Sequence, residues 1–235
     1  LSISFTSVDI DIIAPFVKGL NNNKSICKLN FHCVDLLGGK IFTIMLPFFK
    51  ANNNLDTIYM EDCVFGEEGA RLLALAIGSF DSLAELSLIN TNIADEGLVD
   101  IITALSMHPN MKTLDLDGNQ LQTNGCKALA TLLKCSVTKL ENLDLRDNEI
   151  NDEGMDVLVP VLAHHNHLKS LYLCNNQRVS SKRWQQLSTI LKNPNSKLER
   201  REISGINIDD EALAAYAHSL TNNGSLITLS MLGIQ

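Results

Sequence analysis

The sequence predicts an α/β solenoid, a horseshoe-shaped arc with a parallel β-sheet on its concave face and α-helices on its convex face. A leucine-type pattern returns along the chain at intervals of about 28 residues, a period typical of stacked repeats. Each return is followed by apolar residues spaced four apart, which is the spacing of one helix face. One strand and one helix cannot bury their apolar faces alone, so neighbouring units must stack.

Each repeat opens with a strand in which leucine-type residues alternate with polar ones. The regular units begin at Leu55, Leu83, Met111, Leu140 and Leu168. In such a stretch alternate side chains point to opposite faces, so Leu143 and Leu145 are expected inside and Asp144 is expected to face solvent. Because strands and helices alternate along the chain, the sheet is expected to be parallel.

The rest of each unit predicts a turn and a helix. Acidic pairs such as Asp95-Glu96 precede a glycine at the expected helix start, where the helix dipole favours negative charge. The turn after the strand often holds an asparagine, whose amide can hydrogen-bond exposed backbone of neighbouring coils. These asparagines are Asn119, Asn148 and Asn176.

The outer units are less regular. The pair Gly38-Gly39 predicts a distorted turn, Trp184 follows an apparent one-residue insertion near Arg178, and Arg201 stands where a leucine belongs. In several units another residue replaces the turn asparagine: Val34, Cys63, Thr91 and Ile206.

We expect residues 1–235 to form one domain of a longer protein, since Leu1 already falls inside a strand pattern and no linker interrupts the repeats. The end coils are expected to present apolar side chains and unpaired strand edges, which would be covered by further repeats or by end-to-end self-association. These side chains are Ile3, Phe5, Leu229 and Met231.

The composition narrows the class of protein. The formal net charge of −8 argues against nucleic acid as a partner and favours basic protein surfaces. No apolar run is long enough for a membrane span, and no signal peptide is visible, so a cytoplasmic location is expected. The six cysteines form no CxxC pair, which predicts free thiols rather than disulfides or a zinc site.

Two segments carry a resemblance to a known family. They are LENLDLRDNEINDEGMDVLVPVLAHHNH (140–167) and MKTLDLDGNQLQTNGCKALATLL (111–133). The chain resembles leucine-rich repeat proteins of the ribonuclease-inhibitor-like class along essentially its whole length. That class includes inhibitors, innate-immune receptor domains, cytoskeletal regulators and GTPase-activating proteins, so the resemblance implies the fold and leaves the function open.

The concave strand face is the candidate site, because the curvature of a solenoid makes it a broad groove for another protein. Acids gather in its middle, where Asp115 and Asp144 should be neighbours and Asp117 should pair with Arg146. Such a surface favours a partner with a basic or mixed surface. The predicted contact residues are Tyr59, Glu61, Asp62, Glu85, Asp115, Asp117, Asp144, Arg146 and Tyr172.

Other chemistry finds little support. The stretch from Asp115 to Asn119 opens like a calcium-binding loop, but Gln120 and Cys126 occupy the positions that require glycine and glutamate. His32 and Cys33 could form a nucleophile pair, yet no third group or oxyanion donor is identifiable. We therefore expect no catalytic residues, cofactor or metal. A GTPase-activating-protein-like regulator and an architectural segment of a larger assembly remain as alternatives.

Overall fold

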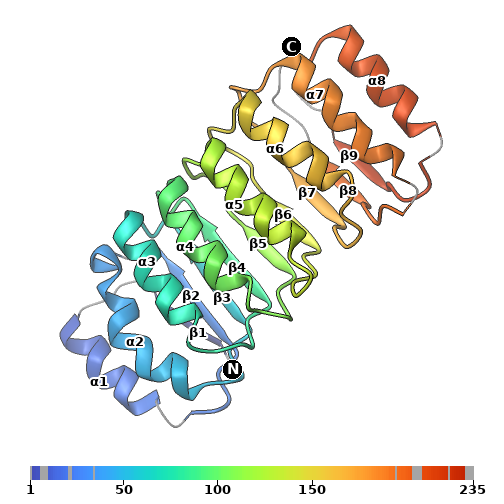
Figure 1. The fold of residues 1–235 in the computed structure, drawn as a ribbon. Helices are drawn as coiled ribbons and strands as arrows, with labels where there is room; N and C mark the ends of the chain where they lie inside the picture. The colour runs from blue at the N-terminus through green and yellow to red at the C-terminus, as the bar shows by residue number, and fades with distance from the viewer. Residues whose placement is uncertain are drawn as a thin grey trace.

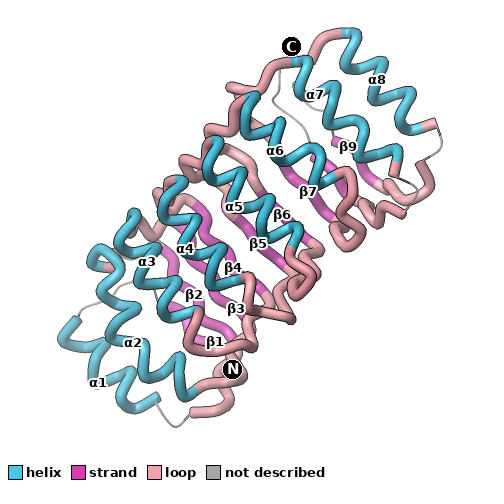
Figure 2. Tube along the Cα trace, in the orientation of Figure 1, coloured by secondary structure: helices cyan, strands magenta, loops and turns pink. Residues whose placement is uncertain are grey.

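The strands of the computed structural model form one parallel sheet in chain order, β1 to β9, and the helices cover one face of that sheet (Figures 1 and 2). The structure describes residues 2–5, 10–20, 23–33, 35–193, 195–202, 208–221 and 223–230. The strands are β1 (Ser2–Phe5), β2 (Lys28–His32), β3 (Thr57–Glu61), β4 (Glu85–Ile89), β5 (Thr113–Asp115), β6 (Asn142–Asp144), β7 (Ser170–Tyr172), β8 (Arg200–Glu202) and β9 (Thr228–Ser230). The helices are α1 (Ile10–Leu20), α2 (Lys40–Ala51), α3 (Gly66–Ile77), α4 (Asp95–Leu105), α5 (Thr123–Lys134), α6 (Asp152–Leu162), α7 (Ser181–Leu187) and α8 (Asp210–Leu220), with 3-10 turns at Leu37–Gly39 and Ser188–Lys192.

The leucine pattern builds the core between sheet and helices. The strands from β3 to β7 each place one leucine-type residue beside its equivalent in the next strand, and these five members of the row are fully buried. In register they are Ile58, Leu86, Leu114, Leu143 and Leu171. The predicted solenoid with a parallel sheet is therefore confirmed.

The turn asparagines hold successive coils together. The side-chain amide of Asn119 donates to the carbonyl of Leu88 in the preceding repeat at 2.7 Å, and its oxygen accepts from the backbone of Ile93 at 3.0 Å. Asn148 donates in the same way to the carbonyl of Leu116 at 2.9 Å. These bonds satisfy buried backbone groups that no helix or strand pairs, as the sequence predicted.

The glycine at the start of the helices is explained by close packing of neighbouring units. A Cβ atom on Gly97 would lie 2.8 Å from the Cβ of Ala70, and one on Gly154 would lie 2.8 Å from the sulfur of Cys126. Both distances are shorter than carbon and sulfur atoms tolerate, so a larger residue would push adjacent helices apart.

The irregular units show the distortions that their sequences indicate. Gly38 and Gly39 adopt left-handed φ angles of 63° and 85°. Trp184 is fully buried, and the short helix α7 continues into the turn Ser188–Lys192. Arg201 occupies the core row beside Leu171, in the place predicted for a leucine.

Several expectations for the ends and turns involve residues whose placement is not described. Leu1, Val34, Ile206 and Met231 lie outside the described residues, and so does the side chain of Ile3. Phe5 and Leu229 are both half-buried, and Phe5 stacks on Phe31 with ring centroids 4.8 Å apart.

The six cysteines are free thiols in the structure. Among the described residues, none of the helices combines the length and the apolar character that a membrane crossing requires.

Candidate functional site

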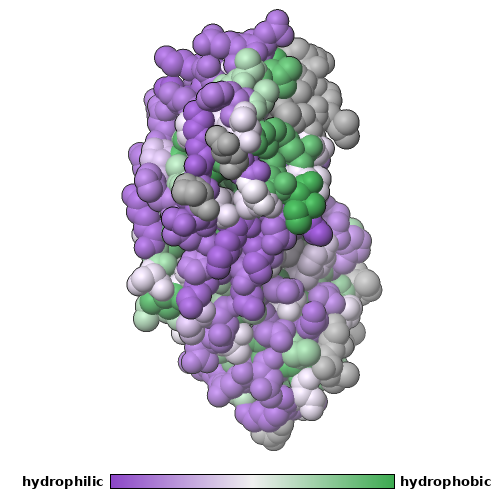
Figure 3. Space-filling view, turned by 90° about the vertical axis from the view of Figure 1, so that its right-hand side faces the viewer, coloured by the Kyte–Doolittle hydropathy of each residue, from purple (hydrophilic) through white to green (hydrophobic). Residues whose placement is uncertain are grey.

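The exposed face of the sheet carries the predicted contact residues in regular rows. One row runs across five strands in register as Tyr59, Ser87, Asp115, Asp144 and Tyr172. The two tyrosines therefore flank the two acids, as the repeat spacing predicted. Seen from the side in Figure 3, hydrophilic residues cover much of the middle of the molecule, whereas hydrophobic residues gather in its upper half.

Arg146 forms ion pairs with two of the central acids, Asp144 and Asp117. Its guanidinium binds Asp144 through Nη2 at 2.6 Å and through Nε at 2.9 Å, and it reaches Asp117 at 3.3 Å. The guanidinium carbon also lies 5.5 Å from the centre of the Tyr172 ring. The predicted pair between Asp117 and Arg146 is present, and Asp115 and Asp144 are the register neighbours expected.

The expected exposure of Asp144 is wrong. Asp144 belongs to the exposed face, yet only 8% of its surface is open to solvent. The reason is local: Arg146 follows two residues later on the same face and folds back over the carboxylate, with both strand neighbours alongside. Asp144 therefore anchors Arg146 and offers little surface to a partner.

Asp115 is the acid in this group without a cationic partner of its own. The salt bridges among the described residues do not include it, and its oxygen accepts only the backbone N–H of Asp117, at 3.1 Å. The pKa of Asp115 is raised to about 6, mainly by burial; the backbone hydrogen bond from Asp117 and the charge of Arg146 lower it, and the carboxylates of Asp144 and Asp117 raise it. Burial also raises the pKa of Asp117, although Arg146 opposes the shift.

The N-terminal part of the same face holds a second group. The hydroxyl of Tyr59 donates a hydrogen bond to Glu61 at 3.1 Å. Burial is the largest cause that raises the pKa of Tyr59, and this hydrogen bond is the next. Glu61 also contacts the ring of His32 at 3.0 Å. Glu85 is exposed on the neighbouring strand β4 and adds negative charge to this part of the face.

Neither alternative chemistry at these residues gains support. The side chain of Asn119 hydrogen-bonds the backbone, and Asp117 forms an ion pair with Arg146. Both residues therefore serve the repeat structure, and the resemblance to a calcium-binding loop follows from the repeat pattern. Burial and the nearby Asp62 and Glu61 raise the pKa of Cys33, which is the opposite of what activates a thiol nucleophile.

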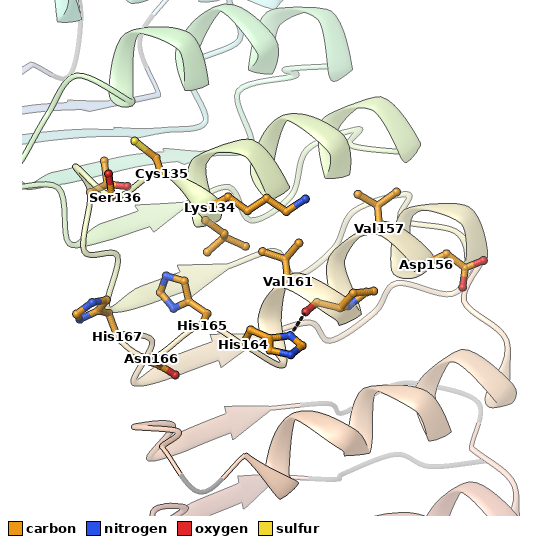
Figure 4. Close-up of a pocket in the computed structure, with 13 residues that line it drawn as sticks. Lys134, Cys135, Ser136, Asp156, Val157, Val161, His164, His165, Asn166 and His167 are labelled. Atoms are coloured by element: carbon orange, nitrogen blue, oxygen red, sulfur yellow. Dashed lines mark hydrogen bonds between the residues drawn. The ribbon is translucent and has the colours of Figure 1, made fainter.

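The sequence did not predict a hollow on the helix side. It measures about 860 Å³ and lies between α5 and α6 and the loops that follow them (Figure 4). Its walls include Lys134 and Asp156, and three histidines come from the segment after α6. Burial, with His167 nearby, lowers the pKa of His165 to about 4. The sequence feature that could have indicated this hollow is the run His164-His165-Asn166-His167. The repeat spacing predicted only that these residues lie on the helix side of the sheet.

Known proteins share the repeat. The family model described as Leucine Rich repeat matches residues 108–130 and 138–159. Mouse (Mus musculus) NACHT, LRR and PYD domains-containing protein 12 is 33% identical over 140 residues, covering 58% of this chain and 13% of that protein. Pig (Sus scrofa) ribonuclease inhibitor is 26% identical over 181 residues, covering 76% of this chain and 39% of the inhibitor.

A third relative is matched over most of this chain. Mouse NACHT, LRR and PYD domains-containing protein 5 is 27% identical over 212 residues, which is 90% of this chain and 18% of that protein. The chain thus spans well under half the length of each of these three relatives. Together with the nine-stranded parallel sheet, these matches identify the chain as a leucine-rich repeat protein related to ribonuclease inhibitor and to the NACHT, LRR and PYD domains-containing proteins.

Proposed function

We propose that this chain is a protein-interaction module that binds a partner on its strand face, with a basic side chain of the partner placed against Asp115. The observation that carries the proposal is the half-buried carboxylate of Asp115, which is desolvated yet forms none of the salt bridges among the described residues. Desolvating such a charged carboxylate costs the folded chain free energy, whereas an incoming Lys or Arg would form a charge-assisted hydrogen bond there.

The flanking residues support a protein partner. Tyr59 and Tyr172 stand on either side of the acids, and tyrosine is enriched among residues that dominate binding energy at interfaces. Leucine-rich repeat domains typically bind proteins, and the name of one relative, ribonuclease inhibitor, says that it acts on an enzyme. The proposed contact surface comprises Tyr59, Glu61, Asp62, Glu85, Asp115, Asp117, Arg146 and Tyr172, with Asp144 holding Arg146 in place beneath them.

The experiment compares capture of partners by the wild type with capture by matched variants. Asp115→Asn combined with Tyr172→Ala removes the central charge and one anchor without unpairing Arg146 from Asp144. The control is Asp100→Asn, which makes the same charge change at an exposed position of helix α4. Partners are identified by mass spectrometry, and their affinity is then measured over a series of salt concentrations.

We expect the strand-face variant to lose partners that the control retains, with a wild-type association rate that falls as salt screens the acids. Equal capture by both variants would contradict the proposal. Binding lost instead through changes at the hollow between α5 and α6 would favour the architectural alternative, in which the helices make the contact. A GTPase-activating-protein-like role would show as accelerated hydrolysis by a bound GTPase.

A further inference from the structure

Three metal-ligating side chains meet at one edge of the strand face. His32 ends strand β2, Cys33 follows it with a left-handed φ of 52°, and Asp62 occupies the equivalent position after β3 with φ 54°. The parallel register places His32 beside Glu61, and the backbone N–H of Cys33 donates to the carbonyl of Glu61 at 2.9 Å. The stacking of two repeats thus joins residues about one repeat apart in the sequence.

The donor atoms are spaced like the corners of a coordination shell. The sulfur of Cys33 lies 3.5 Å from Nε2 of His32 and 3.8 Å from Oδ2 of Asp62, and all three donors lie within 4.8 Å of one another. A tetrahedral ion with bonds of about 2.0–2.3 Å separates its ligand atoms by about 3.3–3.8 Å. The two closest separations therefore need little adjustment.

Neighbouring side chains already hold two of these donors in the required orientation. Nδ1 of His32 lies 3.0 Å from the carboxylate of Glu61, so a proton on Nδ1 is stabilised and Nε2 keeps its lone pair. The side-chain amide of Asn90 donates to Oδ1 of Asp62 at 2.9 Å, which leaves Oδ2 directed at Cys33. Metal sites in proteins depend on such outer partners of histidine and carboxylate ligands.

We propose that His32, Cys33 and Asp62 bind a Zn²⁺ ion, with Glu61 and Asn90 as positioning residues. One nitrogen, one sulfur and one oxygen donor suit zinc, whereas Mg²⁺ and Ca²⁺ prefer oxygen alone. On binding, the Cys33 thiol releases its proton to solvent and the thiolate bonds to the ion. All three ligands are exposed, so the fourth position is open to water or to a side chain of a bound protein.

Sequence spacing did not predict this site because its ligands come from two repeats. Zinc motifs in sequences are marked by clustered cysteines, whereas Cys33 and Asp62 meet only through the coil register. Both residues have left-handed φ angles, and their side chains approach each other to 3.8 Å between Sγ of Cys33 and Oδ2 of Asp62.

The test uses the metal-free chain and Co²⁺ as a coloured probe for zinc. We expect one equivalent of Co²⁺ to produce a sulfur-to-cobalt charge-transfer band in the near ultraviolet, and Zn²⁺ to displace it. Cys33→Ser should abolish the band, while Cys135→Ser, which alters a half-buried thiol near helix α5, should leave it unchanged. Glu61→Gln should weaken binding by about 10–100-fold without removing the band.

A second measurement needs no substitution. Zn²⁺ should protect Cys33 from alkylation, read residue by residue by mass spectrometry, and a chelator should reverse the protection. No charge-transfer band, a band that survives Cys33→Ser, or alkylation of Cys33 unaffected by zinc would overturn the proposal. Zinc binding lost on changing His165 or His167 instead would assign the metal to the helix-side hollow and would equally refute this site.

Discussion

Replacing Asp115 by asparagine should stabilise the protein near neutral pH. Burial holds the pKa of Asp115 at about 6, above its ordinary 3.8. A raised folded-state pKa means that the associated stability is fully present below the unfolded pKa of 3.8 and is lost as pH rises through about 6. At about pH 8 the wild type therefore carries the whole cost of an ionised, desolvated carboxylate.

The magnitude follows from the shift. The rise of about 2 pKa units corresponds to about 3 kcal/mol at about 1.4 kcal/mol per unit. Solvent screens part of this cost because the side chain is only half-buried, so a gain of about 1–2 kcal/mol is expected. Asparagine keeps the oxygen that accepts the backbone N–H of Asp117, so the substitution removes the charge and retains the bond.

The assay is urea unfolding followed by circular dichroism at about pH 8 and about pH 4. Asp115→Asn should raise the free energy of unfolding at the higher pH, and most of the difference should vanish at the lower pH. Glu85→Gln, at an exposed position of the same face, should change stability by less than about 0.5 kcal/mol. A destabilised Asp115→Asn, or a gain that does not depend on pH, would refute the reasoning.

Further predictions concern the core and the partner. Leu145→Ala removes a fully buried side chain and should cost about 2–5 kcal/mol in denaturant unfolding, and a loss below about 1 kcal/mol would show that the position is not core. Arg201→Met should stabilise the chain by about 1–3 kcal/mol, because a buried charge with unsatisfied donors costs free energy. The guanidinium of Arg201 donates to the hydroxyl of Tyr216 at 2.7 Å, and its other two nitrogens lack hydrogen-bond partners among the described residues. Lower stability of the variant would contradict this prediction. Affinity for a partner, measured by calorimetry, should fall as pH drops below about 6 in the wild type and stay level in Asp115→Asn.

The repeat spacing predicted neighbours well because the register of a parallel solenoid advances by one repeat per strand. It placed Asp115 beside Asp144 and brought Asp117 to Arg146, and both contacts are present. It also predicted which asparagines bridge adjacent coils. These properties follow from backbone periodicity, which the sequence displays directly.

Properties that depend on side-chain conformation could not be read in this way. The low exposure of Asp144 results from the path of the Arg146 side chain over it. The contact between Cys33 and Asp62 results from left-handed φ angles in two turns. Neither a rotamer nor the sign of φ at a non-glycine residue follows from the spacing of leucines.

The central acids of the strand face differ in how they are paired, and this difference supports the proposed binding role of the face. Asp144 and Asp117 share Arg146, and that pairing fixes their positions. Asp115 lies beside this network with a raised pKa and takes part in none of the salt bridges of the described residues. A chain under pressure for stability alone would place a neutral residue there, because an unpaired, desolvated charge costs free energy. In the proposed complex a positively charged side chain of the partner would recover part of that cost, so the desolvated carboxylate of Asp115 would favour binding.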